Sequence, residues 1–137
     1  MPKLDFAFLA HAAMVDSLGL LSVLGAGISL LRGPQFPLRQ QLTIVGRITW
    51  ENDEQDSTHL LRVLAQHPDG ETLWDQHHPL PPVEMPRDPD LPPFSGFALP
   101  LAVEMRRPAL YSVTVRLDGD EVARLPLRAE ALLPQPS

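Results

Sequence analysis

The sequence predicts an all-β domain, folded as a two-sheet antiparallel sandwich of seven or eight strands with Greek-key-like connections. Three observations indicate this fold. Short segments alternate between apolar and polar residues with a period of two, and turn sequences rich in glycine and proline separate them. A proline-rich stretch over residues 79–93 suits a long crossover between two sheets, because proline is excluded from helices and from central strands.

Length and composition fit one small domain. The chain has 137 residues, for which we expect a folded part over residues 1–131 and a flexible C-terminal tail over 132–137. It has no cysteine, which excludes disulfides and thiol catalysis and favours a reducing cytoplasm. The net charge of −6 and the lack of a large basic cluster disfavour a nucleic-acid partner. The apolar run over residues 18–31 is too short to span a bilayer, so no membrane insertion is expected.

The first third of the chain is predicted to contain one apolar strand and a second strand that is bent at its glycines. Residues 3–12 read as a strand that is apolar on both faces, with Phe6 and Phe8 on one face and Leu9 on the other. Such a strand belongs in the middle of a sheet, or under a covering segment or a second copy of the chain. Gly25 and Gly27 interrupt the next apolar run and indicate a bent strand. A phosphate-binding loop would need a following helix, which the sequence does not predict.

The middle of the chain predicts a long strand followed by a hairpin. Residues 40–50 alternate, and Gly46 is expected to make room for a facing aromatic side chain. The acidic residues 51–57 lack the spacing of a calcium loop and are predicted to form a plain hairpin loop. Residues 58–66 and 71–77 are predicted to pair across a turn at residues 67–70, whose Pro-Asp-Gly sequence suits a tight corner.

The end of the chain predicts a strand over residues 94–105 and a final hairpin over 110–128. The apolar residues of both strands have odd numbers, so they share one face only if the loop between the strands has an odd number of residues. This favours a three-residue loop at 117–119 with a bulge at its glycine. Val113 would then face Ala123, and Tyr111 would face Leu125. The last strand is expected at a sheet edge, with Pro126 turned toward the open side.

One constellation of side chains suggests a metal site. His59, Asp75 and His77 would meet if the predicted hairpin pairs along its full length, and imidazole with carboxylate is a common ligand set. His78 would point to the opposite face from His77. The alternative is a solvated histidine cluster at the end of a hairpin. Asp5 lies in an otherwise apolar strand, either as a functional carboxylate or as the partner of an arginine.

The expected function is binding rather than catalysis. No nucleophile motif or carboxylate pair is evident, and no cofactor is expected. The aromatic side chains exceed what a thin core needs, so some are expected at an interface: Phe8, Phe36, Trp50, Trp74 and Phe94. The sequence therefore predicts a protein-interaction or assembly module that binds another protein or forms a homodimer. The alternative is a small-ligand or metal-binding module, and the proline-rich stretch is either a plain crossover or a recognition motif.

The N-terminal pattern also resembles a known group. The segment DFAFLA, followed by a glycine-containing stretch and then PQFP, is similar to a family of small uncharacterised bacterial proteins. The closing hairpin, with a tyrosine strand and an Asp-Gly turn, is similar as well. The resemblance implies a β-sandwich of unknown function and carries no activity or site residues.

Overall fold

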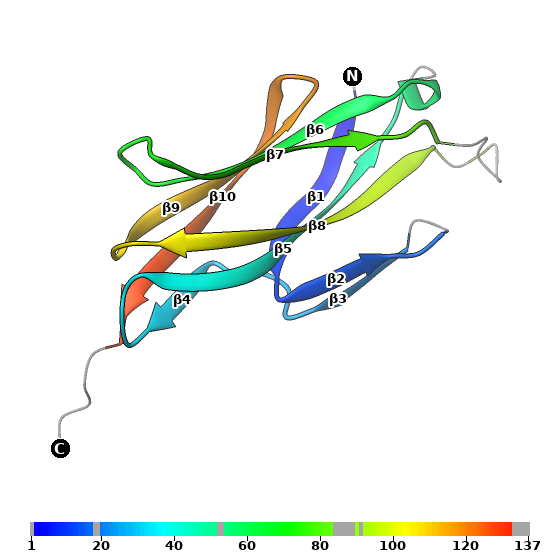
Figure 1. The fold of residues 1–137 in the computed structure, drawn as a ribbon. Coiled ribbons are helices and arrows are strands. Elements are labelled where there is room, and N and C mark those ends of the chain that lie inside the picture. Colours follow the sequence, from blue (N-terminus) through cyan, green and yellow to red (C-terminus); the bar gives the residue numbers. More distant parts are fainter. Residues whose placement is uncertain (1, 18–19, 52–53, 84–89, 91, 133–137) are drawn as a thin grey trace.

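The computed structural model describes residues 2–17, 20–51, 54–83, 90 and 92–132, and within them ten strands form three sheets (Figure 1). The predicted all-β sandwich is confirmed, although the structure has more strands and one more sheet than expected. A single 3-10 helix, η1 (Glu54–Asp56), is described. No helix among the described residues is long and apolar enough to cross a membrane.

Two sheets form the sandwich. The smaller has the order β1 (Lys3–Ala10), β5 (Leu38–Thr49) and β8 (Phe94–Met105), with all pairs antiparallel. The larger has the order β4 (Leu30–Gly33), β10 (Asp120–Ala131), β9 (Ala109–Leu117), β6 (His59–Gln66) and β7 (Thr72–Leu80). Its β4–β10 pair is parallel, unlike the fully antiparallel arrangement that the sequence predicts.

The core lies between these two sheets and is built from the inward-facing residues of each alternating strand. Its largest buried side chains are Trp50, Leu9, Leu42, Ile44, Ile48, Leu61, Leu101, Met105 and Leu127. Gly46 faces Phe97 on the neighbouring strand, and a Cβ atom at position 46 would lie 2.2 Å from the Phe97 ring. The expectation that Gly46 makes room for a facing aromatic is therefore confirmed.

A third sheet covers part of the outer side of the smaller sheet. The hairpin of β2 (Ala12–Val15) and β3 (Leu21–Leu24) contacts β5 and β8 on the outer side of the smaller sheet (Figure 1). Ala10 and Val45 on that outer side are fully buried. On the first strand itself, Ala10 at its end is buried, whereas Phe6 is 39% exposed and Phe8 is half-buried. The strand lies at the edge of its sheet rather than in the middle.

The glycines of the bent stretch adopt the conformation that the bend requires. Gly25 and Gly27 have φ angles of 70° and 83°. A Cβ atom at Gly25 would also lie 2.3 Å from the His11 ring. The predicted bend is present, and it directs the chain from the covering hairpin into β4.

The register of the final hairpin differs from the prediction. Its loop is the two-residue turn Asp118-Gly119, with φ angles of 50° and 92°, as a type I′ turn requires. The extra residue is accommodated one step later, in a bulge between Glu121 and Ala123. The pairs are consequently Val113 with Leu125 and Tyr111 with Leu127. The bulge in the strand, and not the length of the loop, brings the apolar residues of both strands onto one face.

Two connections also differ from the expected pattern. Residues 51–57 do not close a hairpin, because β5 belongs to the smaller sheet and β6 to the larger. The alternation along each strand shows which face is buried but not which strand lies beside it. β7 extends through Pro79 to Leu80, and β7 and β8 lie in different sheets, so the predicted crossover is present. Residues 84–89 and Leu91 of the proline-rich stretch lie outside the described residues.

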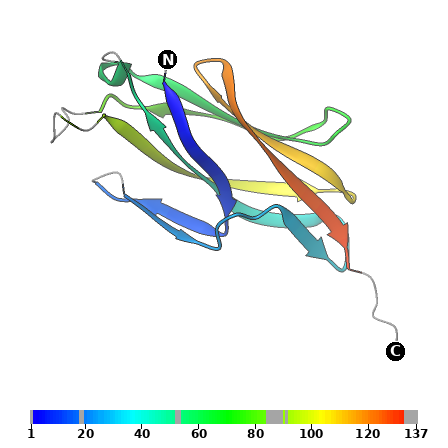
Figure 2. The same cartoon turned by 180° about the vertical axis from the view of Figure 1, so that it is seen from behind.

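The last strand is an edge along part of its length. β4 pairs with the end of β10, over Arg128–Ala131 (Figure 2), and the Arg128 N–H donates to the Ser29 carbonyl at 2.8 Å. Pro126 lies two residues earlier on β10, so its nitrogen faces the same side, where no described strand pairs. The missing donor of Pro126 therefore faces open space, as expected.

Candidate functional site

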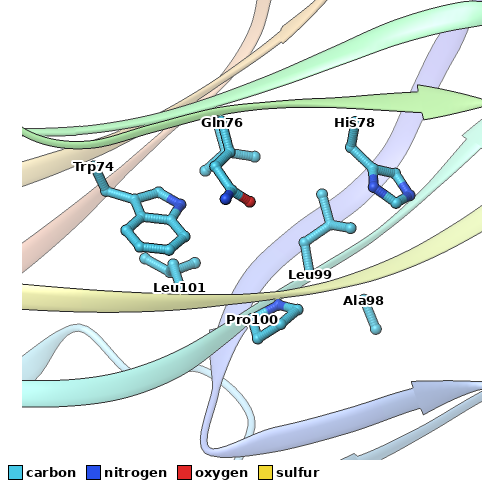
Figure 3. Close-up of a pocket in the computed structure, with 8 residues that line it drawn as sticks. Trp74, Gln76, His78, Ala98, Leu99, Pro100 and Leu101 are labelled. Atoms are coloured by element: carbon cyan, nitrogen blue, oxygen red, sulfur yellow. The ribbon is translucent and has the colours of Figure 1, made fainter.

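A groove opens where the two sheets end on the same side of the sandwich. The larger sheet has five strands and the smaller has three, with β7 and β8 as end strands. Side chains from β7 and β8 face each other across a cavity of about 190 Å³ (Figure 3). The unequal size of the sheets leaves the inner side of β7 without a full covering layer, and this creates the groove.

Alternation along β7 supplies one wall of the groove. Trp74, Gln76 and His78 point toward β8, because they pair with the core positions of β6. Leu99 and Leu101 of β8 form the opposite wall, with Ala98 and Pro100 beside them. Val63 and Leu101 are buried, so the floor is apolar and continuous with the core.

The wall formed by β7 carries polar groups that are available to a ligand. The Trp74 indole N–H, the Gln76 amide and the His78 ring make no hydrogen bond or ion pair with any residue that the structure describes. An apolar cavity with a few converging polar groups is the usual composition of a binding site. These groups give the groove hydrogen-bonding capacity along one side and apolar contact along the other.

The predicted metal triad is not assembled. His59 pairs with Leu80, whereas His77 pairs with Arg62. Asp75 accepts hydrogen bonds from the Arg62 guanidinium at 2.9 and 2.8 Å. No group of three or more potential metal ligands occurs among the described residues. The prediction of a site at His59, Asp75 and His77 is therefore wrong, because it placed His59 two to three residues too close to His77 along the ladder.

The electrostatics of Asp75 support the same conclusion. The hydrogen bonds from Arg62 hold the pKa of Asp75 below its usual value, and partial desolvation opposes this only in part. The positive charges of Arg62, His77 and Arg116 act in the same direction as the hydrogen bonds. Asp75 is therefore an ionised partner of arginine on the outer face of the sheet.

His59 has a structural role at the start of β6. Its Nδ1 lies 2.5 Å from an Asp118 carboxylate oxygen, and its Nε2 lies 2.7 Å from the Glu54 carbonyl oxygen. The ring also stacks on Trp50 at 4.2 Å. Burial by itself would lower the pKa of His59, but the hydrogen bonds to Asp118 and Glu54, with their negative charges, outweigh burial and raise it.

His67 is also fully engaged. Its Nε2 accepts a hydrogen bond from Arg107 Nε at 2.9 Å, and its Nδ1 lies 2.9 Å from an Asp69 oxygen. Arg107 further bridges to Asp69 at 2.6 Å, and the Arg107 carbonyl accepts the Tyr111 hydroxyl at 2.6 Å. A tyrosine bonded to the backbone four residues upstream is a known sandwich corner. This cluster joins two turns and leaves neither ring nitrogen of His67 open to a ligand.

The aromatic residues predicted at an interface lie in different environments. Trp50 is 2% exposed and donates its indole N–H to Ser95 at 2.8 Å, so it belongs to the core and the prediction that it contacts a partner is wrong. Phe8, Phe36 and Phe94 are half-buried. Phe8 stacks on Phe6, Phe36 packs against the core, and Phe94 lies under the Arg47 guanidinium.

Trp74 is the predicted interface residue that lines the groove. Sequence reasoning missed Gln76 and His78, although a signal was present. The predicted strand over residues 71–77 already placed Gln76 on the same face as Trp74, and the same alternation continued by one residue places His78 there too. Asp5, considered as a functional carboxylate, instead pairs with Arg47 at 3.1 Å and Thr49 at 2.6 Å.

Comparison with known proteins gives a family but no activity. Residues 5–130 match the model of a family described as a family of unknown function, DUF6941. No curated protein matches the chain.

Proposed function

The chain belongs to the family of unknown function DUF6941, and since membership implies no activity, we propose a function from the groove. The protein is a non-enzymatic protein-interaction module, and the groove between β7 and β8 accepts one apolar side chain from an extended segment of a partner. The observation that carries this proposal is an apolar cavity flanked by three unengaged polar groups at the junction of two sheet edges.

The size of the cavity selects the kind of occupant. Small-molecule and cofactor sites usually enclose about 300–1,000 Å³, whereas this cavity has about 190 Å³. An apolar cavity of about 150 Å³ is known to hold a benzene ring. The groove therefore has room for a single leucine-sized or ring-sized group, which fits the anchor residue of a peptide better than a whole cofactor.

The two edges favour a short extended segment. β7 and β8 are both end strands, and an end strand has backbone groups that can pair with another chain. Each contains a proline, Pro79 in β7 and Pro100 in β8, which lacks an N–H donor and so interrupts long strand pairing. A partner is thus held by one inserted side chain and by polar contacts to Gln76 and His78, with little continuous pairing.

A displayed library of random linear peptides tests this function. Peptides selected on the wild-type protein should share an apolar anchor, and their affinity can be measured by fluorescence anisotropy. Trp74→Ala and Leu99→Ala should each weaken binding by at least tenfold, since loss of a buried hot-spot side chain commonly costs more than about 1.4 kcal/mol. Leu24→Ala is the matched control, because it removes an apolar side chain that is 70% exposed on β3.

The outcomes separate the groove from other surfaces. Selected peptides that bind Trp74→Ala as tightly as wild type would show that the groove is not the site. Failure of any apolar-anchored peptide to bind would contradict the proposal as a whole. The absence of cysteine supports our further proposal that the module works in a reducing cytoplasm.

A further inference from the structure

A second surface of different chemistry lies on the outer side of the larger sheet. The residues that point away from the core on β4, β10, β9 and β6 include five arginines, and we call this surface the arginine face: Arg32, Arg62, Arg116, Arg124 and Arg128. Three carboxylates share it, on Asp75, Glu121 and Glu130. The face therefore carries an excess of two positive charges, although the whole chain has a net charge of −6.

Two residues within this face are covered by the side chains around them. Thr114 and Leu64 point outward from adjacent strands, yet they are only 2% and 6% exposed. No element of the described structure packs over them, so the long side chains around them provide the cover. Arginine stems readily lie along apolar surface in this way.

Two of the five arginines have no carboxylate partner. Arg32, Arg62 and Arg124 form ion pairs within the face. Arg116 and Arg128 form none with any residue that the structure describes, and the buried Nε of Arg116 has no hydrogen-bond acceptor. Arginine that lacks an internal carboxylate partner keeps its charge available to a carboxylate supplied by another molecule.

Apolar side chains accompany the unpaired arginines. Leu30 and Leu110 occupy the positions on either side of Arg128, on β4 and β9. They are 42% and 45% exposed. Leu60, near Arg62 on β6, is also 45% exposed. Arginine beside exposed apolar surface is a composition enriched at protein interfaces.

We propose that the arginine face docks an acidic segment of a partner protein, one in which carboxylates alternate with apolar side chains. The carboxylates pair with Arg116 and Arg128, and the apolar side chains cover Leu30 and Leu110. Charge complementarity supports this occupant, because the face already pairs arginine with carboxylate at three places. A nucleic acid fits less well, since its phosphates would pair with the arginines but leave Leu30 and Leu110 uncovered.

The test is a titration of the full chain with a fluorescein-labelled peptide of alternating glutamate and leucine, followed by anisotropy at low and physiological salt. We expect binding that weakens with salt. Arg116→Gln combined with Arg128→Gln should lower affinity by about tenfold, at roughly threefold for each arginine, as for a partly exposed ion pair. Thermal melting establishes that the variants fold.

The control is a variant with the same change in net charge elsewhere, Arg39→Gln combined with Arg106→Gln. These side chains are 78% and 73% exposed and do not belong to the arginine face. Unchanged affinity in this control supports a localised site, whereas equal loss in both double variants would overturn the proposal. So would the absence of peptide binding at low salt, or tighter binding of a single-stranded oligonucleotide of equal charge.

Discussion

Gly46→Ala tests the contact that fixes β8 against β5. The new methyl group would lie 2.2 and 2.6 Å from two atoms of the Phe97 ring and 3.0 Å from the Phe6 carbonyl oxygen. Carbon atoms pack at about 3.5–4.0 Å, so the buried ring must move by more than an ångström. Overpacking of this kind lowers the free energy of unfolding by up to about 3 kcal/mol. Alanine also restricts the unfolded chain more than glycine does, which raises the free energy of unfolding by about 1 kcal/mol.

The expected net loss is therefore about 2 kcal/mol in the free energy of unfolding. For a chain of this length it corresponds to a fall in Tm of roughly 7 °C. Urea denaturation measures the loss, and a double-mutant cycle with Phe97→Leu identifies its cause. If the clash is responsible, Gly46→Ala should cost at least about 1 kcal/mol less in the Phe97→Leu background. Wild-type stability in Gly46→Ala, or strict additivity in the cycle, would refute the steric explanation.

Two further predictions concern charged groups. Both ring nitrogens of His59 face acceptors, on Asp118 and Glu54, so only the protonated ring donates both bonds. Its raised pKa means that this stabilisation is full below about pH 6.5 and is lost as pH rises through the folded-state pKa. The lowered pKa of Asp118 means that its contribution is full above about pH 4 and is lost as pH falls below that value. Urea denaturation between pH 6 and 8 should show wild type losing more stability than His59→Gln, and equal losses would contradict the assignment. Asp75→Asn should free Arg62 on the arginine face and strengthen binding of the glutamate–leucine peptide by about threefold; weaker binding in the same anisotropy assay would count against that surface.

The sequence was sufficient to predict the strands and the tight turn, but not which strands lie beside each other. The turn at His67–Gly70 closes the predicted β6–β7 hairpin because its residues set the corner themselves: the His67 carbonyl accepts the Gly70 N–H at 2.9 Å. The loop over residues 51–57 contains no comparable signal, and its two flanking strands belong to different sheets. Alternation shows which side of a strand is buried, but the partner strand depends on packing across the whole domain.

The candidate site shows the same limit. Alternation correctly separated His77 from His78 onto opposite faces of β7. The pairing register could not be derived, because a bulge beside Gln66 shifts the partners of β7 by one residue. Without that register, the sequence does not show that His59 lies opposite Leu80 rather than His77. The groove itself depends on the unequal numbers of strands in the two sheets, which no local pattern encodes.

The two proposed surfaces have a common origin in β7. Its alternate residues Trp74, Gln76 and His78 line the groove, while Asp75 and His77 lie on the arginine face. β7 is an end strand, so β8 covers its inner face only in part and its outer face meets solvent. A residue in a central strand would have to be apolar on the covered side, whereas here polar side chains are tolerated on both. Because the two sets of side chains point in opposite directions, a partner bound in the proposed groove would leave the arginine face accessible to a second partner.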